Sequence, residues 1–123
     1  MRISTISLTL ALLVFASLNA YTKRAAPNPV KPLVHDGVEY SAPMGVEKMG
    51  VIEARDAKSK ALLWAQKIYR IKYNPDLERD VQWVFIKEIE IEDESLIVIN
   101  ERGQKYALDL KTRKVTEAEL SAD

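Results

Sequence analysis

Residues 85–110, FIKEIEIEDESLIVINERGQKYALDL, carry the clearest structural pattern in the chain. Three segments alternate between apolar and polar side chains or run apolar, as strands do: residues 85–92, 96–100 and 105–110. Two short polar segments, 93–95 and 101–104, separate them, and Gly103 in the second can supply the left-handed residue of a tight turn. The pattern predicts two consecutive antiparallel hairpins, followed by a short edge strand at Val115.

The preceding segment, residues 51–73, fits two different structures. Five apolar residues recur in it at helical spacing: Ala57, Ala61, Trp64, Ala65 and Ile68. The alternative is a pair of strands, 51–55 and 62–73, joined by a polar turn. Three residues alternate on one face of the second of these, which supports the strands: Tyr69, Ile71 and Tyr73. Periodicity alone leaves both structures open.

An internal repeat bears on this choice. Residues 54–62 and 107–115 share the form Ala-x-Asp-x-Lys-[Ser/Thr]-[Lys/Arg]-x-[Leu/Val]. The carboxylates of Asp56 and Asp109 can accept hydrogen bonds from the backbone of the turn that each opens, and the hydroxyl residues Ser59 and Thr112 can do so from the other end. A turn held by these side-chain hydrogen bonds is typical of the closed end of a β-hairpin. Because the second copy lies in a clear β pattern, the repeat favours strands for the first copy too.

The first copy resembles the Ala-x-Asp-x-x-Thr-Gly-Lys-x-x-Trp signature of quinoprotein-type (PQQ-like) β-propeller blades. Ala54, Asp56, Ser59 and Trp64 stand at the matching positions, whereas Lys60 stands where the family has glycine. In that family the tryptophan docks each blade against its neighbour, so the resemblance implies a packing role for Trp64. A propeller needs at least about four blades of roughly 40 residues. The resemblance therefore implies one to two blade-like units, and it carries over no cofactor site.

Between the two copies, the sequence predicts one short helix or helical turn near residues 75–84. Asn74 can serve as its N-cap, and Pro75 fits the first helical position. Three apolar residues then line one side: Leu77, Val81 and Val84. The fold class expected from the whole chain is mainly β, a small antiparallel sheet of hairpins with this one helix inserted.

The beginning of the chain has the form of a secretory signal peptide. Arg2 precedes an uncharged apolar run over residues 6–18, and small residues follow up to Ala20, where we expect cleavage. An uncleaved membrane anchor is the alternative, but the run is shorter than the ~20 residues of a span. The expected organisation is therefore a signal peptide (1–20), a flexible proline-containing leader (21–32), a single β-rich domain (33–116) and a frayed tail (117–123).

Composition excludes several classes of function. The chain has 18 basic and 18 acidic residues, so its formal net charge of zero offers no field for a nucleic acid. It has no cysteine, which excludes a disulfide scaffold, a thiolate metal site and a thiol nucleophile. An exported domain without disulfides has to be held by packing, which fits a bacterial periplasm or secretion into the medium.

The single histidine, His35, lies beside Asp36 and Gly37, whose sequence predicts the tight turn of a small hairpin over residues 33–40. Without a second histidine the sequence shows neither a metal cluster nor a Ser/His arrangement. We therefore expect an exposed turn residue, and no metal-binding or catalytic residue.

Binding candidates are few. Glu88, Glu90 and Glu92 share one face of a predicted strand and are followed by Asp93 and Glu94. This acidic row could hold Ca²⁺ or a basic partner, although a solvated edge explains it more simply. Most aromatic residues are needed for the core of so small a domain. Trp83 is the one we expect near an exposed rim, because it follows the polar Gln82 and the pattern allows the helix to end either near Asp80 or near Val84.

Two functional classes remain. One is a non-catalytic binding or accessory module of the bacterial envelope, which recognises a protein or glycan through a sheet face or an unpaired edge. The other is a small secreted hydrolase or enzyme inhibitor, whose chemistry would rest on His35 with the acidic row. No set of nucleophile, base and orienting residue is recognisable, so the sequence favours the first class. It implies no cofactor and no membrane span after signal cleavage, and it leaves oligomerisation open.

Overall fold

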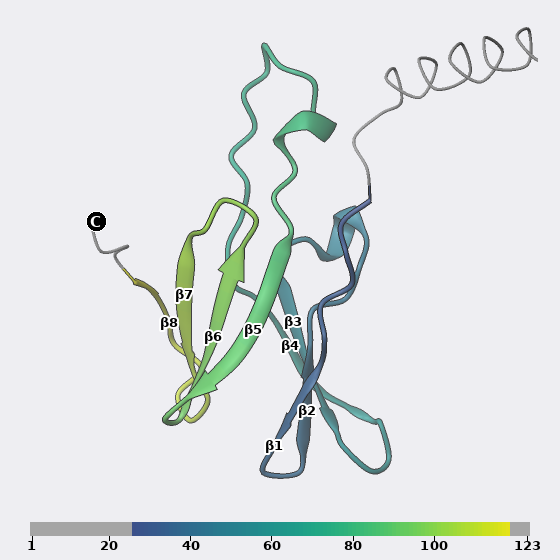
Figure 1. The fold of residues 1–123 in the computed structure, drawn as a ribbon, viewed down its shortest axis with the longest axis vertical. Helices are drawn as coiled ribbons and strands as arrows, with labels where there is room; N and C mark the ends of the chain where they lie inside the picture. The colour runs from purple at the N-terminus through teal and green to yellow at the C-terminus, as the bar shows by residue number, and fades with distance from the viewer. Residues whose placement is uncertain (1–25, 119–123) are drawn as a thin grey trace, which may run out of the picture.

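A computed structural model describes residues 26–118, which form two four-stranded antiparallel sheets (Figure 1). The first sheet contains, in spatial order, β1 (Leu33–His35), β2 (Val38–Ser41), β3 (Val51–Asp56) and β4 (Leu62–Lys67). The second contains β5 (Ile86–Glu92), β6 (Ser95–Asn100), β7 (Lys105–Asp109) and β8 (Val115–Ala118). Each sheet is a meander in which strands adjacent in sequence pair with each other.

The predicted hairpins at the end of the chain are confirmed, with β5, β6 and β7 in the expected places. Strands are also the right choice for the ambiguous segment, but β4 ends at Lys67 rather than at residue 73. The reason is that its partner β3 begins at Val51. The last pairing bond runs from the Ile68 amide to the Gly50 carbonyl (2.6 Å), and beyond it no strand remains for β4 to pair with. Strand β8 runs on to Ala118, past the expected end of the domain at 116.

Of the two forms expected near residues 75–84, a helix or a helical turn, the helix is absent. This segment contains only one 3₁₀ turn, η3 (Asp80–Gln82), and a second such turn, η2 (Val46–Lys48), lies before β3. The Asn74 side chain accepts from the Asp76 amide (2.9 Å), as the side chain of an N-cap does, but no regular helix follows it. The side chain of Gln82 then occupies backbone carbonyls that a helix would need for its own hydrogen bonds.

The two sheets face each other and share one core. Its largest fully buried apolar side chains come from both sheets: Ile52, Leu96, Val98 and Leu108. Tyr69, just after β4, stacks on Tyr106 of β7 with ring centroids 5.2 Å apart. An antiparallel sheet with one apolar face has to cover that face, and here each sheet covers the other.

The repeated turns, between β3 and β4 and between β7 and β8, are built alike. The carboxylate of Asp56 accepts from the backbone amides two and three residues further on, both at 2.9 Å, and Asp109 does the same at 2.8 and 2.9 Å. The hydroxyls of Ser59 and Thr112 each accept from the amide two residues on, at 3.3 and 3.2 Å. These backbone bonds lower the pKa of both aspartates, so the turns are closed by ionised carboxylates.

The residue after the hydroxyl is left-handed in both turns, with φ of 67° at Lys60 and 63° at Arg113. This is the position at which the PQQ-like signature has glycine. A side chain raises the energy of this conformation, which glycine adopts freely.

Trp64 lies where β4 meets the second repeated turn. It is half-buried, 6.0 Å from the ring of Tyr40, and the guanidinium of Arg113 lies over it at 4.5 Å from the ring centroid. The side-chain amide of Gln66 donates to the Arg113 carbonyl at 2.7 Å. Residues of β4 thus hold a turn of the other sheet, by a cation–π contact and a hydrogen bond.

Replacing Lys60 with glycine should stabilise the protein by about 0.5–1 kcal/mol, because the left-handed strain is relieved. The substitution removes little stabilising interaction, since the exposed Lys60 ammonium makes only a long contact with the Glu39 carboxylate, at 3.4 Å. Urea unfolding followed by tryptophan fluorescence measures the change. Arg113→Gly is the matched control: it relieves the same strain but removes the contact with Trp64, so it should gain less or lose stability. A clear destabilisation by Lys60→Gly would contradict this account of the turn.

Candidate functional site

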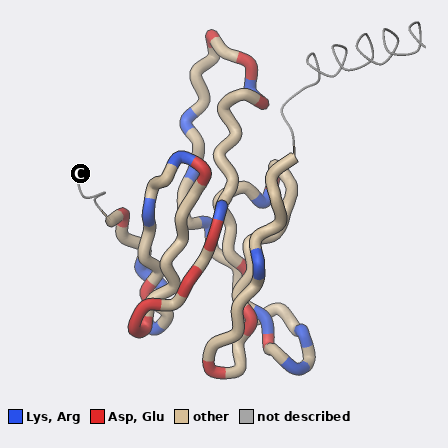
Figure 2. Tube along the Cα trace, viewed as in Figure 1, with Lys and Arg blue, Asp and Glu red and all other residues tan. Residues whose placement is uncertain are grey.

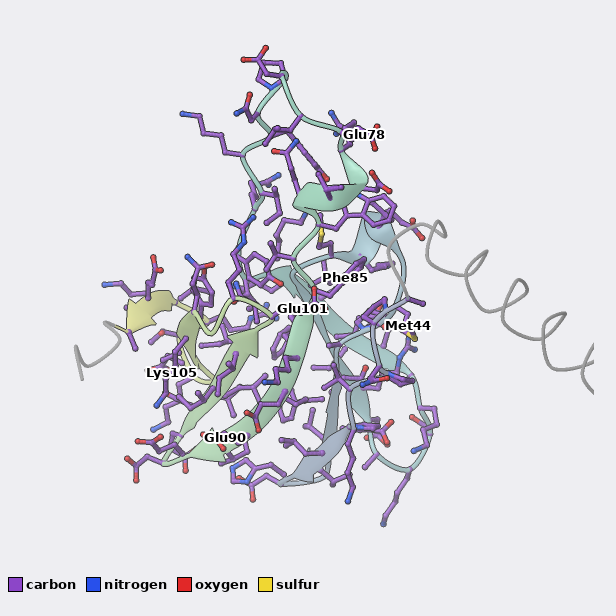
Figure 3. All side chains as sticks on the ribbon, turned by 45° about the horizontal axis from the view of Figure 1, so that its top comes forward. Met44, Glu78, Phe85, Glu90, Glu101 and Lys105 are labelled. Atoms are coloured by element: carbon purple, nitrogen blue, oxygen red, sulfur yellow. The ribbon has the colours of Figure 1, made fainter. Side chains whose placement is uncertain are left out.

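The glutamates singled out in the sequence lie on β5, an edge strand of the second sheet. Glu88, Glu90 and Glu92 are all exposed, and Glu90 points outward from the strand (Figure 3). Alternate residues of a strand are about 7 Å apart, which is too far for three carboxylates to share one ion. Within residues 26–118, none of the three forms an ion pair. The three glutamates therefore place negative charge along the edge of the sheet but do not form a shared ion site.

Trp83 is half-buried rather than displayed on a rim. Its ring meets Phe85 edge-to-face, with centroids 6.1 Å apart and planes at 76°. The same holds more widely, because every aromatic ring among residues 26–118 is buried or half-buried. Glycan-binding surfaces present open aromatic faces for stacking, and no aromatic residue in the described part of the chain is exposed.

The most prominent feature of the surface is the segment between β4 and β5. Residues 70–83, here called the projecting loop, extend beyond the ends of both sheets (Figure 1). Its base is held by Tyr69, whose hydroxyl donates to the Val84 carbonyl at 2.6 Å, and by the Val84 amide, which lies 3.3 Å from the sulfur of Met49. Burial raises the pKa of Tyr69, which keeps this hydroxyl protonated as a donor.

The tip of the projecting loop is closed by one side chain. Gln82 is only 8% exposed, and its amide oxygen accepts from the Asn74 amide at 2.7 Å. Its nitrogen donates back to the Asn74 carbonyl at 3.0 Å, and to the carbonyls of Leu77 and Glu78 at 3.3 and 3.0 Å. A single buried amide therefore satisfies several backbone groups that the loop would otherwise leave without partners.

The loop also presents side chains to solvent. The guanidinium of Arg79 lies 3.9 Å from the ring centroid of Tyr73, which covers that aromatic face. Leu77 and Val81 are 55% and 60% exposed. Charges of both signs surround them (Figure 2), and Glu78 lies among them near the tip (Figure 3). The loop is thus a braced projection with two aliphatic side chains in water.

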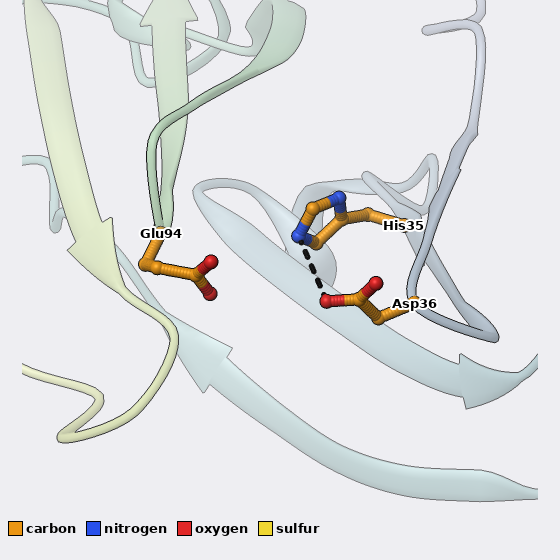
Figure 4. A group of neighbouring side chains, drawn as sticks. All are labelled: His35, Asp36 and Glu94. Atoms are coloured by element: carbon orange, nitrogen blue, oxygen red, sulfur yellow. Dashed lines mark ion pairs between the residues drawn. The ribbon is translucent and has the colours of Figure 1, made fainter.

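A second group of side chains lies at the opposite end of the sheets. His35 and Asp36, at the β1–β2 turn, meet Glu94 from the β5–β6 turn (Figure 4). The His35 Nε2 atom is 3.3 Å from an oxygen of Asp36, and one ligand atom from each of the three residues lies within 4.8 Å of the others. The sequence singled out His35 with Asp36, and Glu94 as the end of the acidic row, but it gave no sign that these residues meet, because almost sixty residues separate them.

Glu53 of β3 is a buried carboxylate with two cationic partners. Glu53 is 8% exposed, and its oxygens accept from Arg55 Nη2 at 3.1 Å and from Lys48 Nζ at 3.3 Å. Burial alone would raise the pKa of Glu53, but these hydrogen bonds and charges lower it on balance. A carboxylate held in its ionised form by two cations acts as a structural ion pair rather than as a proton donor.

Neither a protein-family model nor a curated protein matches the chain. The resemblance to PQQ-like blades therefore rests on the residues quoted for it. Within residues 26–118 there is no helix of the length and apolarity needed to cross a bilayer. The expected signal peptide and residues 21–25 of the expected leader lie outside the described residues, whereas Val30, in the rest of that leader, packs against the core.

Gln82→Glu should open the tip of the projecting loop. The change keeps the shape of the side chain but sets a carboxylate against three carbonyl oxygens, and the loss of buried hydrogen bonds costs about 1–3 kcal/mol. Hydrogen exchange and limited proteolysis within residues 74–82 should accelerate at least about tenfold. Glu78→Gln, on the same loop but with an exposed side chain, should leave both rates near those of the wild type. Equal protection in the two variants would show that Gln82 does not brace the loop.

Proposed function

We propose that the protein is a non-catalytic, exported binding or accessory module of the bacterial envelope, and that it binds a protein partner through the projecting loop. The observation that carries this proposal is the combination at the loop tip: the backbone is braced by the buried Gln82, while Leu77 and Val81 remain in water. Loops positioned by a rigid scaffold are the usual place for recognition.

The energetics favour such a loop as a binding element. Covering an exposed aliphatic side chain contributes up to about 1.5–3 kcal/mol, and this gain is reduced when the segment has to be ordered on binding. The hydrogen bonds of Gln82 hold the loop in one conformation beforehand, so less of the gain is lost. Two exposed aliphatic side chains on one short loop, with charged residues between and beside them in the sequence, resemble the anchors of a small protein interface.

A protein fits this surface better than a glycan. The exposed groups at the tip are aliphatic and charged, and the one aromatic ring of the projecting loop that is not at its base, Tyr73, is covered by Arg79. Aliphatic side chains pack into apolar pockets, whereas sugar rings stack on open aromatic faces. The choice of a protein partner follows from this chemistry.

The two sheets are proposed to be two blade-like units related to PQQ-like repeats. Three observations support the proposal: each sheet is a four-stranded antiparallel meander, both carry the same aspartate-closed turn, and Trp64 lies against the neighbouring sheet. The export proposal rests separately on the sequence of residues 1–20.

Site-specific photocrosslinking tests the binding surface. A benzophenone amino acid is placed at Leu77 or Val81 of the full chain, which is expressed in its native host and irradiated in intact cells. We expect one discrete cross-linked protein from both positions, and much less of it when Gln82→Glu is also present. Val34 and Leu63 are matched controls, because they are 59% and 53% exposed but lie on the sheets. The proposal fails if the loop positions give no product, or the same products as the controls.

A further inference from the structure

The group formed by His35, Asp36 and Glu94 combines the ligand types that divalent transition metals prefer. One imidazole nitrogen and two carboxylates have a ligand atom each within 4.8 Å of one another (Figure 4). Imidazole and carboxylate are common zinc ligands, with bonds of about 2.0–2.2 Å. Asp36 is 79% exposed and Glu94 is also exposed, so both side chains are free to close by the small distance that coordination needs.

A second observation is independent of the acidic groups. The Nε2 atom of His35 is shielded from solvent and makes no hydrogen bond, although it lies beside Asp36. A buried polar atom without a partner is destabilising, by an amount comparable to a lost hydrogen bond. A metal ion between the three side chains would bond to this nitrogen and to the Asp36 carboxylate that now lies 3.3 Å from it.

The charges around these three side chains also favour a bound cation. Among the described residues, no lysine or arginine forms an ion pair with Asp36 or Glu94. Their negative charge reaches Tyr40, where burial first and then these two carboxylates raise the pKa of the hydroxyl. Two neighbouring carboxylates repel each other, and a bound cation removes that repulsion.

The backbone around the group is anchored. The Gly37 carbonyl accepts from the Ala57 amide at 2.9 Å, which ties the β1–β2 turn to the β3–β4 turn. The Glu94 carbonyl accepts from the Leu110 amide at 3.0 Å, which ties the β5–β6 turn to the segment after β7. Both turns are therefore held in place by backbone bonds that leave the side chains of the candidate ligands free for coordination.

We propose that His35, Asp36 and Glu94 form a binding site for a divalent transition metal ion of the zinc type, which links the ends of the two sheets. Three protein ligands leave at least one coordination position for water. The ion cross-links the β1–β2 turn with the β5–β6 turn, so it binds the folded chain and stabilises it. This site is separate from the projecting loop, which lies at the other end of the molecule (Figure 1).

The test uses the full chain, purified without a histidine tag and freed of metal by a chelator, then titrated with ZnCl₂ in a calorimeter. We expect one saturable site and a rise in the melting temperature with added Zn²⁺, with a much smaller rise for Mg²⁺. Because the chain contains a single histidine, the NMR signals of its imidazole report directly on ligation. Those signals should shift with Zn²⁺ and broaden with paramagnetic Co²⁺.

Matched variants separate this site from adventitious binding. Glu94→Gln and His35→Gln should each weaken Zn²⁺ binding at least about tenfold. Glu90→Gln removes an exposed carboxylate from the same sheet, outside the group, and should bind as the wild type does. The inference is overturned by the absence of a saturable site, by histidine signals that do not respond, or by equal weakening in Glu94→Gln and Glu90→Gln. None of these outcomes bears on the photocrosslinking of the loop.

Discussion

The packing of one sheet on the other is the interaction on which the rest of this structure depends. Each sheet is a four-stranded meander with a single apolar face, and the chain contains no cysteine to cross-link it. Neither face can remain in water, because the burial of apolar surface is the main force available to so small a protein. Ile52 of the first sheet and Leu96 of the second are both fully buried as a result.

The strand order then determines which turns meet. In an antiparallel meander every second connection returns to the same end, so the turns after β1, β3, β5 and β7 gather at one end of the molecule (Figure 1). Both aspartate-closed turns are among them, and so are the turns that carry His35 and Glu94. The connection from β4 to β5 lies at the other end, which explains why the projecting loop and the candidate metal site are far apart.

The sequence pattern predicted the elements whose hydrogen bonds join residues close together in the chain. The alternation in residues 85–110 identified the hairpins, and the repeated Asp56 and Asp109 motifs identified turns whose hydrogen bonds lie within a few residues. The helix near residues 75–84 was predicted wrongly because the side chain of Gln82 takes over backbone carbonyls, an interaction that periodicity does not register. The acidic row of the sequence includes Glu94, but its approach to His35 was not predicted, because it arises only when the two sheets pack.

The packing of the two sheets also leaves the exposed side chains of the projecting loop without cover. The apolar faces of the two sheets already cover each other, so neither is free to receive Leu77 or Val81. The loop cannot fold back either, because Gln82 closes its tip and Tyr69 fixes its base. A flexible loop would let these side chains find partial cover on the sheets, whereas a braced loop keeps them in water. Keeping apolar side chains in water destabilises the isolated chain. The same arrangement favours binding when another molecule covers these side chains.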